Sequence, residues 1–254
     1  MTHDVSRIEL WWLPLGAGGW FVRFNGRVYE ALRALRERRR PLDLYHSALV
    51  VWVPEGRFVV ENCWPIPDGE GAGARGVAVE GAVASEWIAR FTAFRYEVRC
   101  WRDGVIADAG AAVASPQVLS RDLDGARRLL GLVGELPRPV WGRDELGTGE
   151  MWNSNSVIAW LLVRAGLAVE AIRPPAGGRA PGWAAGVAVA RRQHGLPRPA
   201  LDEGLPRPAL DQELPQSALD QRLPDLPWEE RALSNPDPGQ ELPARAHAGS
   251  HGRI

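Results

Sequence analysis

One hairpin limits the folds available to this chain more than any other stretch does. Leu44–Val53 reads LYHSALVVWV and is rich in β-branched and aromatic residues, which favours a strand. Pro54–Gly56 is a turn, and Arg57–Asn62, RFVVEN, is the returning strand. The central run is apolar on both faces, so other elements must cover the strand on both sides. The sequence therefore predicts a layered fold built around this hairpin.

A helix is predicted between residues 26 and 40, upstream of the hairpin. Val28, Leu32 and Leu35 fall on one face of this helix, and Pro41 ends it. The basic run at its end, RERRR, is interpreted as a solvated helix terminus, with an anion-binding patch as the alternative.

Further strands are expected before and after the hairpin in the sequence. Phe94–Trp101 alternates apolar and charged residues as a half-buried strand does, which favours a core position for Cys100. The other predicted elements are strands at Ile8–Leu15, Trp20–Phe24, Val77–Val79 and Trp183–Arg191, a helix at Ser120–Val133 capped by Ser120, and a loop at Arg173–Gly182.

The last quarter of the chain differs in composition from the rest. Leu-Pro recurs every nine residues from Leu196, in LPRPALDEG, LPRPALDQE and LPQSALDQR. Proline at this frequency is incompatible with a helix or a sheet interior, and the unit is too small to bury a core. The sequence therefore predicts one α+β domain over residues 6–192 and a disordered, Pro-rich tail over residues 193–254. A protein contact made through the tail is an open alternative.

Composition and targeting signals exclude several classes of function. A formal charge of −1 gives no electrostatic reason to expect nucleic-acid binding. The two cysteines, Cys63 and Cys100, have no metal-ligand spacing and need no disulfide in a domain of this size. The N-terminus lacks the features of a signal peptide, and no stretch has the ~20 apolar residues of a membrane span. We expect a cytoplasmic protein without a metal or organic cofactor.

The stretch Gly142–Leu162, GRDELGTGEMWNSNSVIAWLL, is the strongest candidate for a functional site. A glycine-containing loop leads into an apolar helix that Asn153 can cap and that Gly166 can end. Ser154 would then lie in the first turn, where backbone N–H groups point outward at the positive end of the helix dipole. Acyl-transfer sites place nucleophiles at such positions, although the same residues also serve as ordinary helix caps.

Acyl transfer requires a nucleophile, a base within hydrogen-bond reach and a group that orients the base. Ser154 could be the nucleophile and His46, on the best strand of the chain, the base. Glu61, on the returning strand, could orient His46, because residues across a hairpin can face the same side. The N–H groups at the start of the Ser154 helix would supply an oxyanion site.

These residues resemble the circularly permuted papain-like fold. That group includes permuted relatives of the NlpC-type endopeptidases, the lecithin:retinol acyltransferase-like proteins and the PPPDE peptidases. Tyr45–Leu49 is similar to the strand with the catalytic His, Phe58–Glu61 to the segment with the third polar residue, and Asn153–Val157 to the N-C-x-x-F helix start. The resemblance covers Leu44–Leu167 and its motifs are short. GRDELGTGEMWNSNS is also typical of an actinobacterial family, which implies no function.

The resemblance implies a permuted papain-like α+β domain with an antiparallel sheet, against which the Ser154 helix packs. Ser154 stands where the family has its cysteine. A serine hydroxyl is far less acidic than a thiol, so the resting thiolate–imidazolium pair of papain-like enzymes cannot form. Serine in a cysteine site usually abolishes activity.

Three interpretations follow. We expect a weak or inactive relative whose cleft binds a peptide, a lipid or a protein partner. An active hydrolase or acyltransferase that uses Ser154, His46 and Glu61 is the alternative, and an accidental likeness is the third. The residues expected to line the cleft are Trp152, Asn153, Trp64 and Trp183.

Overall fold

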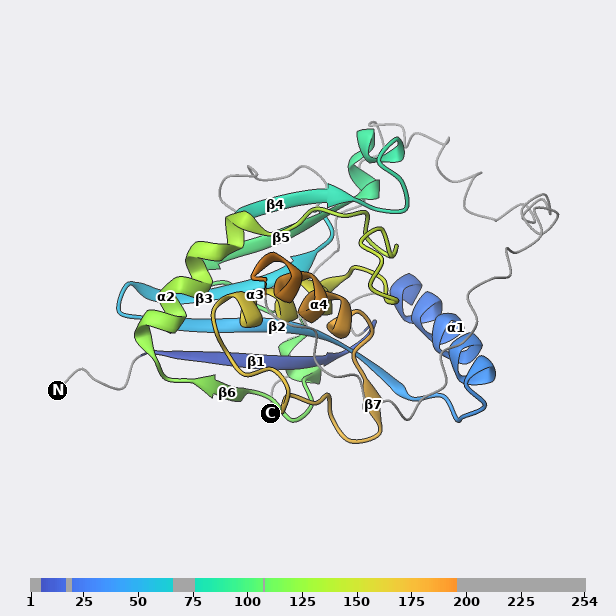
Figure 1. Cartoon of the computed structure of the whole chain (residues 1–254), viewed down its shortest axis with the longest axis horizontal. Helices are drawn as coiled ribbons and strands as arrows, with labels where there is room; N and C mark the ends of the chain where they lie inside the picture. The colour runs from blue at the N-terminus through green and yellow to red at the C-terminus, as the bar shows by residue number, and fades with distance from the viewer. Residues whose placement is uncertain (1–5, 17–19, 66–75, 107, 196–254) are drawn as a thin grey trace, which may run out of the picture. The chain divides into compact units, whose positions relative to one another are not determined.

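The fold is built on an antiparallel sheet, whose strands run across Figure 1 from β4 at the top to β6 at the bottom. The computed structural model describes residues 6–16, 20–65, 76–106 and 108–195. In this part of the chain the strand order is β4–β5–β3–β2–β1–β6. The strands are β1 (Arg7–Pro14), β2 (Asp43–Val53), β3 (Gly56–Cys63), β4 (Val77–Ala82), β5 (Arg95–Arg102) and β6 (Gln117–Ser120), and β7 (Gly178–Arg179) pairs in parallel with the start of β2. The predicted hairpin is confirmed as β2 and β3, at the centre of the sheet.

Three helices cover one face of the sheet, and a fourth lies beside the start of β2 (Figure 1). The α-helices are α1 (Trp20–Arg36), α2 (Leu123–Leu132), α3 (Ser154–Arg164) and α4 (Trp183–Gln193), with short 3-10 turns at η2 (Ile88–Arg90), η3 (Thr92–Phe94), η4 (Ala109–Ala111) and η5 (Val133–Glu135). Helices α2, α3 and α4 share the main core with Leu49 and Val51 of β2. The mixture of helices and antiparallel strands confirms the α+β class.

The opposite face of β2 and β3 has its own, smaller core. Ala48 and Val50 of β2 pack there with Val59 of β3 and with Leu13 and Ile106. The hairpin is therefore covered on both sides, as its doubly apolar sequence required.

Two predicted strands are helices in the structure. Trp20–Phe24 is the first part of α1, and Trp183–Arg191 lies in α4. The second error has a clear cause, because the sequence WAAGVAVARRQ contains four alanines and alanine has the highest helix propensity. Gly182, with φ of +84°, forms the left-handed turn at which α4 begins.

Two local predictions need correction. The helix predicted to be capped by Ser120 begins at Leu123, and Asp122 is its cap because its carboxylate accepts from the N–H of Gly125. In β5, Glu97 and Arg99 are buried rather than solvated, with Arg99 donating to Glu97 over 2.6 Å. Because both side chains are buried, their charges have to be paired inside the protein.

The start and end of α3 are as predicted. Asn153 is the N-cap, and Gly166, with φ of +89°, follows the last turn. Helix α4 packs closely on this helix because Gly186 has no side chain: a Cβ there would lie 2.1 Å from the backbone oxygen of Ser156. The predicted tail at 193–254 lies outside the described residues from residue 196 onward.

Candidate functional site

The central sheet separates near the start of β2. The β2–β3 ladder runs from Val53 opposite Gly56 to Leu49 opposite Val60 and goes no further among the described residues. Beyond that point β2 stays paired with β1, as far as Tyr45, while β3 stays paired with β5. The two halves of the sheet therefore part at the position where the N-terminus of α3 reaches β2.

A cavity of about 310 Å³ lies at this separation. Its wall is mostly apolar and comes from segments far apart in the sequence. The lining residues are Leu15, Gly26, Tyr29, Leu44, Tyr45, His46, Trp64, Val83, Trp141, Gly142, Met151, Asn153, Ser154, Asn155 and Pro181. Two residues of the predicted catalytic set, His46 and Ser154, share this cavity, and Glu61 does not line it.

Asn155 fixes the start of α3 to the central strand. Its side-chain amide donates to the backbone oxygens of Tyr45 and Pro181, both over 2.9 Å. Its carbonyl oxygen accepts from the hydroxyl of Ser47 over 2.8 Å. Asn155 is 2% exposed, so these bonds are formed away from solvent. Sequence reasoning missed this clamp because Asn155 and Ser47 carry no local signal of contact.

The first turn of α3 uses its own polar groups for capping. The side-chain oxygen of Asn153 accepts from the N–H groups of Asn155 and Ser156, over 2.9 and 3.4 Å. The hydroxyl of Ser156 accepts from the N–H of Asn153 and donates to the carbonyl oxygen of Gly182 over 2.7 Å. The N–H groups of Asn155 and Ser156 are therefore not free to bind an oxyanion, which removes most of the expected oxyanion site.

The side chain of Ser154 is free of these bonds. It is partly exposed, lies on the cavity wall, and forms no hydrogen bond with any described residue. The predicted bond between Ser154 and His46 is therefore not formed in the described structure. A hydroxyl without a base in contact has the ordinary low nucleophilicity of an alcohol.

His46 and Glu61 lie on the sheet face that does not carry α3. Side chains alternate along a strand, so His46 shares its face with Ala48 of β2, and Glu61 shares its face with Val59 of β3. Ser47 points the other way, toward Asn155. His46 reaches the cavity at the place where β2 and β3 part.

Burial is the main influence on the pKa of both His46 and Glu61. Burial lowers the pKa of His46 to about 4, against the opposing charge of Asp108. Burial and then Asp108 raise the pKa of Glu61 to about 7, with Arg99 and a hydrogen bond from Cys63 acting in the opposite direction. No hydrogen bond joins His46 to Glu61 within the described ranges. At neutral pH the imidazole is uncharged and lacks the partner that would orient it.

Cys63 does not offer a substitute nucleophile. Burial and the neighbouring Glu61 raise the pKa of its thiol to about 12, so the reactive thiolate is absent at neutral pH. Cys63 and Cys100 are both free thiols. Asp108, which influences both His46 and Glu61, was not foreseen and has no motif around it.

The four predicted cleft residues separate into two pairs. Trp64 and Asn153 line the cavity, and the Trp64 ring lies 5.9 Å from that of Trp141. Trp152 is buried in the main core, and Trp183 packs on Trp12 with ring centroids 5.3 Å apart. Neither Trp152 nor Trp183 lines the cavity.

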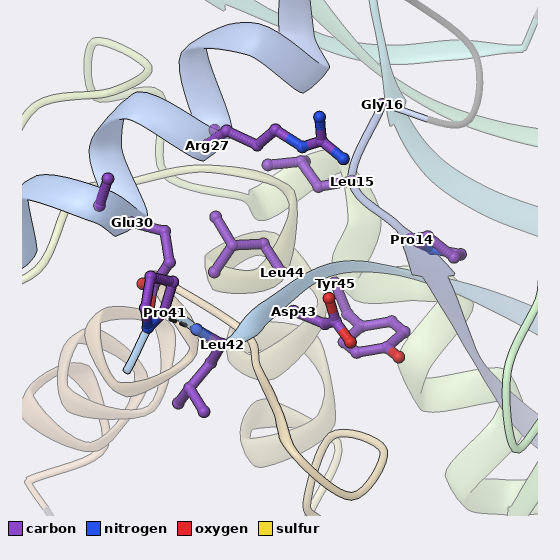
Figure 2. Close-up of a pocket in the computed structure, with 12 residues that line it drawn as sticks. Pro14, Leu15, Gly16, Arg27, Glu30, Pro41, Leu42, Asp43, Leu44 and Tyr45 are labelled. Carbon is purple, nitrogen blue, oxygen red and sulfur yellow. Dashed lines mark hydrogen bonds between the residues drawn. The ribbon is translucent and has the colours of Figure 1, made fainter. Parts of the chain in front are cut away.

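A second cavity, of about 710 Å³, adjoins the first between α1 and the start of β2 (Figure 2). Leu15, Gly26, Leu44 and Tyr45 line both cavities. Leu15 and Leu44 lie between α1 and β2 in Figure 2. A Cβ on Gly26 would lie 2.4 Å from Cδ2 of Leu15, so this glycine allows α1 to approach the boundary between the two cavities.

Comparison with known proteins adds no relative: no family model, no curated protein and no solved structure matches the chain. Within the described ranges, no group of three or more His, Cys, Asp or Glu side chains could hold a metal ion. No helix in the same ranges is long and apolar enough to cross a membrane.

Proposed function

We propose that this is a papain-like domain without catalytic activity, which binds the apolar part of a ligand in the cavity between the start of β2 and the start of α3. The ligand class is an acyl chain or an apolar peptide side chain that carries one hydrogen-bonding group. Such a group would pair with the free hydroxyl of Ser154, while Leu44, Val83 and Trp141 contact the apolar part.

One observation carries the proposal: the cavity is formed, but the polar groups around it are committed to structure. Asn153, Asn155 and Ser156 hold α3 against β2 and α4. The side chains left over, those of Ser154 and His46, form no hydrogen bond with another described residue. Catalysis needs a nucleophile, a base and an orienting group that are joined by hydrogen bonds, whereas binding needs only the apolar wall of the cavity.

An active serine hydrolase or acyltransferase is the second candidate, because Ser154 and His46 line the same cavity. It requires movement of His46 onto Ser154 when substrate binds. Reaction with a fluorophosphonate, which phosphonylates activated serines with loss of fluoride, separates the two candidates. Intact-mass measurement of the wild type and of His46→Ala then reports whether Ser154 carries an adduct that depends on His46.

Binding is tested with the fluorescent probe 1-anilinonaphthalene-8-sulfonate. Ser154→Phe fills the cavity from its wall, and Val118→Phe adds the same ring to exposed β6 as a matched control. Leu35→Ser shows whether the probe binds the exposed side of α1 instead.

We expect no fluorophosphonate adduct, and saturable probe binding that Ser154→Phe weakens at least tenfold while both controls keep it. An adduct on Ser154 that disappears in His46→Ala would establish the enzyme. Probe binding unchanged by Ser154→Phe would refute the cavity as the binding site.

A further inference from the structure

The part of α1 whose side chains are described, residues 26–36, turns an apolar stripe toward solvent. Val28, Leu32 and Leu35, at positions i, i+4 and i+7, are 43, 64 and 77% exposed. These three residues form one stripe, as their spacing predicted, but a helix on a folded domain normally turns such a stripe inward. We call Val28, Leu32 and Leu35 the outer stripe.

The opposite side of α1 is polar and is held by charged partners. Glu30 is 2% exposed and accepts from the N–H of Leu42 over 2.9 Å and from the guanidinium of Arg39. Burial raises the pKa of the Glu30 carboxyl, but these hydrogen bonds outweigh burial and the pKa is lowered. Rotating the helix to bury the outer stripe would expose Ala34 and break the bonds of a buried carboxylate. The outward orientation of the stripe is therefore a property of the fold.

Arginines border the outer stripe. Arg27 and Arg36 lie on its two sides by helical spacing, and Arg38 and Arg40 follow the helix. All four are exposed, and none forms an ion pair with another described residue. The acidic residue among them, Glu37, is already paired with Arg33 and Arg39. The free charge around the stripe is therefore positive.

We propose that α1 is a docking surface for an anionic membrane, and that the helix lies in the plane of the lipid headgroups with its outer stripe among the acyl chains. An apolar face with bordering arginines is the pattern of interfacial helices, because the guanidinium groups reach lipid phosphates while the leucines leave water. This inference does not depend on the proposed ligand cavity.

The size of the stripe favours a membrane over a protein partner. Three aliphatic side chains provide only a fraction of the roughly 800 Å² that each partner contributes to a standard protein interface. Membrane binding accepts a small apolar area, because positive charge near an anionic surface adds to it. No helix among the described residues can span a bilayer, so α1 would lie on the membrane rather than cross it.

The experiment is vesicle co-sedimentation of the full chain with phosphatidylcholine–phosphatidylglycerol vesicles, compared with pure phosphatidylcholine. The variants are Leu32→Ser/Leu35→Ser for the stripe and Arg36→Gln/Arg40→Gln for the charge. Val105→Ser and Arg102→Gln are the matched controls, because both residues are exposed on other parts of the domain. Circular dichroism shows that each variant is folded.

We expect binding to anionic vesicles that falls with added salt and is weak on pure phosphatidylcholine. The stripe variant should lose at least tenfold in partitioning. Each Arg→Gln change should cost about fivefold, and the controls should bind as the wild type does. Absence of binding to anionic vesicles would overturn the proposal. So would a wild type that self-associates through the stripe, seen by sedimentation velocity as a dimer that the stripe variant abolishes, without vesicle binding.

Discussion

Replacing Asn155 with alanine should destabilise the domain far more than the same change at its neighbour, Ser154. Asn155 is buried and forms three side-chain hydrogen bonds, to the backbone of Tyr45 and Pro181 and to the hydroxyl of Ser47. Ser154 is partly exposed and forms none with a described residue. The two residues are adjacent in the same helical turn, so the comparison isolates the effect of the clamp.

The size of the effect follows from the partners left behind. The oxygen of Pro181 keeps a bond of 2.9 Å from the amide of Asn153, whereas the oxygen of Tyr45 and the hydroxyl of Ser47 lose the bonds that Asn155 supplied. Three bonds at about 1 kcal/mol each give a loss of about 3 kcal/mol in the free energy of unfolding. Ser154→Ala should change that free energy by less than about 0.5 kcal/mol.

Urea denaturation of both variants, followed by circular dichroism and extrapolated linearly to zero denaturant, measures the two values. Asn155→Asp is a stricter test, because the carboxylate it introduces would face the carbonyl oxygens of Tyr45 and Pro181. Burial and these oxygens would raise its folded pKa, so stability should fall as pH rises above the unfolded value of about 4. An Asn155→Ala variant within about 1 kcal/mol of the wild type would show that the clamp contributes little.

Two further predictions concern buried groups of the same domain. The folded pKa of Glu61, about 7, lies above its unfolded value, so its contribution to stability is complete below the unfolded pKa of about 4.3 and is lost as pH rises through 7. Between pH 5 and 8 the wild type should lose about 2 kcal/mol relative to Glu61→Gln in urea denaturation, after allowance for partial solvent exposure; parallel pH profiles would contradict this. Gly186→Ala should destabilise by about 2 kcal/mol despite the better helix propensity of alanine, because its Cβ would meet the backbone of α3. Gly131→Ala, in a helix with open space, should stabilise by up to about 1 kcal/mol, and equal thermal shifts for the two variants would refute the packing argument.

Prediction from the sequence succeeded for elements with strong local patterns. The hairpin of β2 and β3 was readable because its alternation and turn residues lie within 20 residues of each other. It failed at Trp183–Arg191, where a short apolar run is ambiguous between strand and helix. It also failed for Glu97 and Arg99. Their charges predicted side chains exposed to solvent, but the two side chains are paired with each other in the interior.

Four of the predicted site residues lie together in the structure. His46 and Ser154 line one cavity, and Trp64 and Asn153 line it with them. The hydrogen bonds between the predicted catalytic residues were not found among the described residues. The polar contact between α3 and β2 is formed by Asn155 and Ser47 instead, one residue after each predicted partner. One position along a strand reverses the face on which a side chain lies, and no motif fixes that choice.

By itself the sequence determined the class of the domain, the central hairpin and both ends of α3, since alternation, capping and glycine turns act between residues a few positions apart. Tertiary structure alone decided where β2 and β3 part, and which residues meet there: Asn155 and the backbone of Tyr45 are 110 positions apart. It also decided that the leucines of α1 face outward, because the buried carboxylate of Glu30 needs Arg39 and Leu42 on the inner side. The stripe pattern of a helix gives its two faces but not their direction, which depends on what the other face must bind.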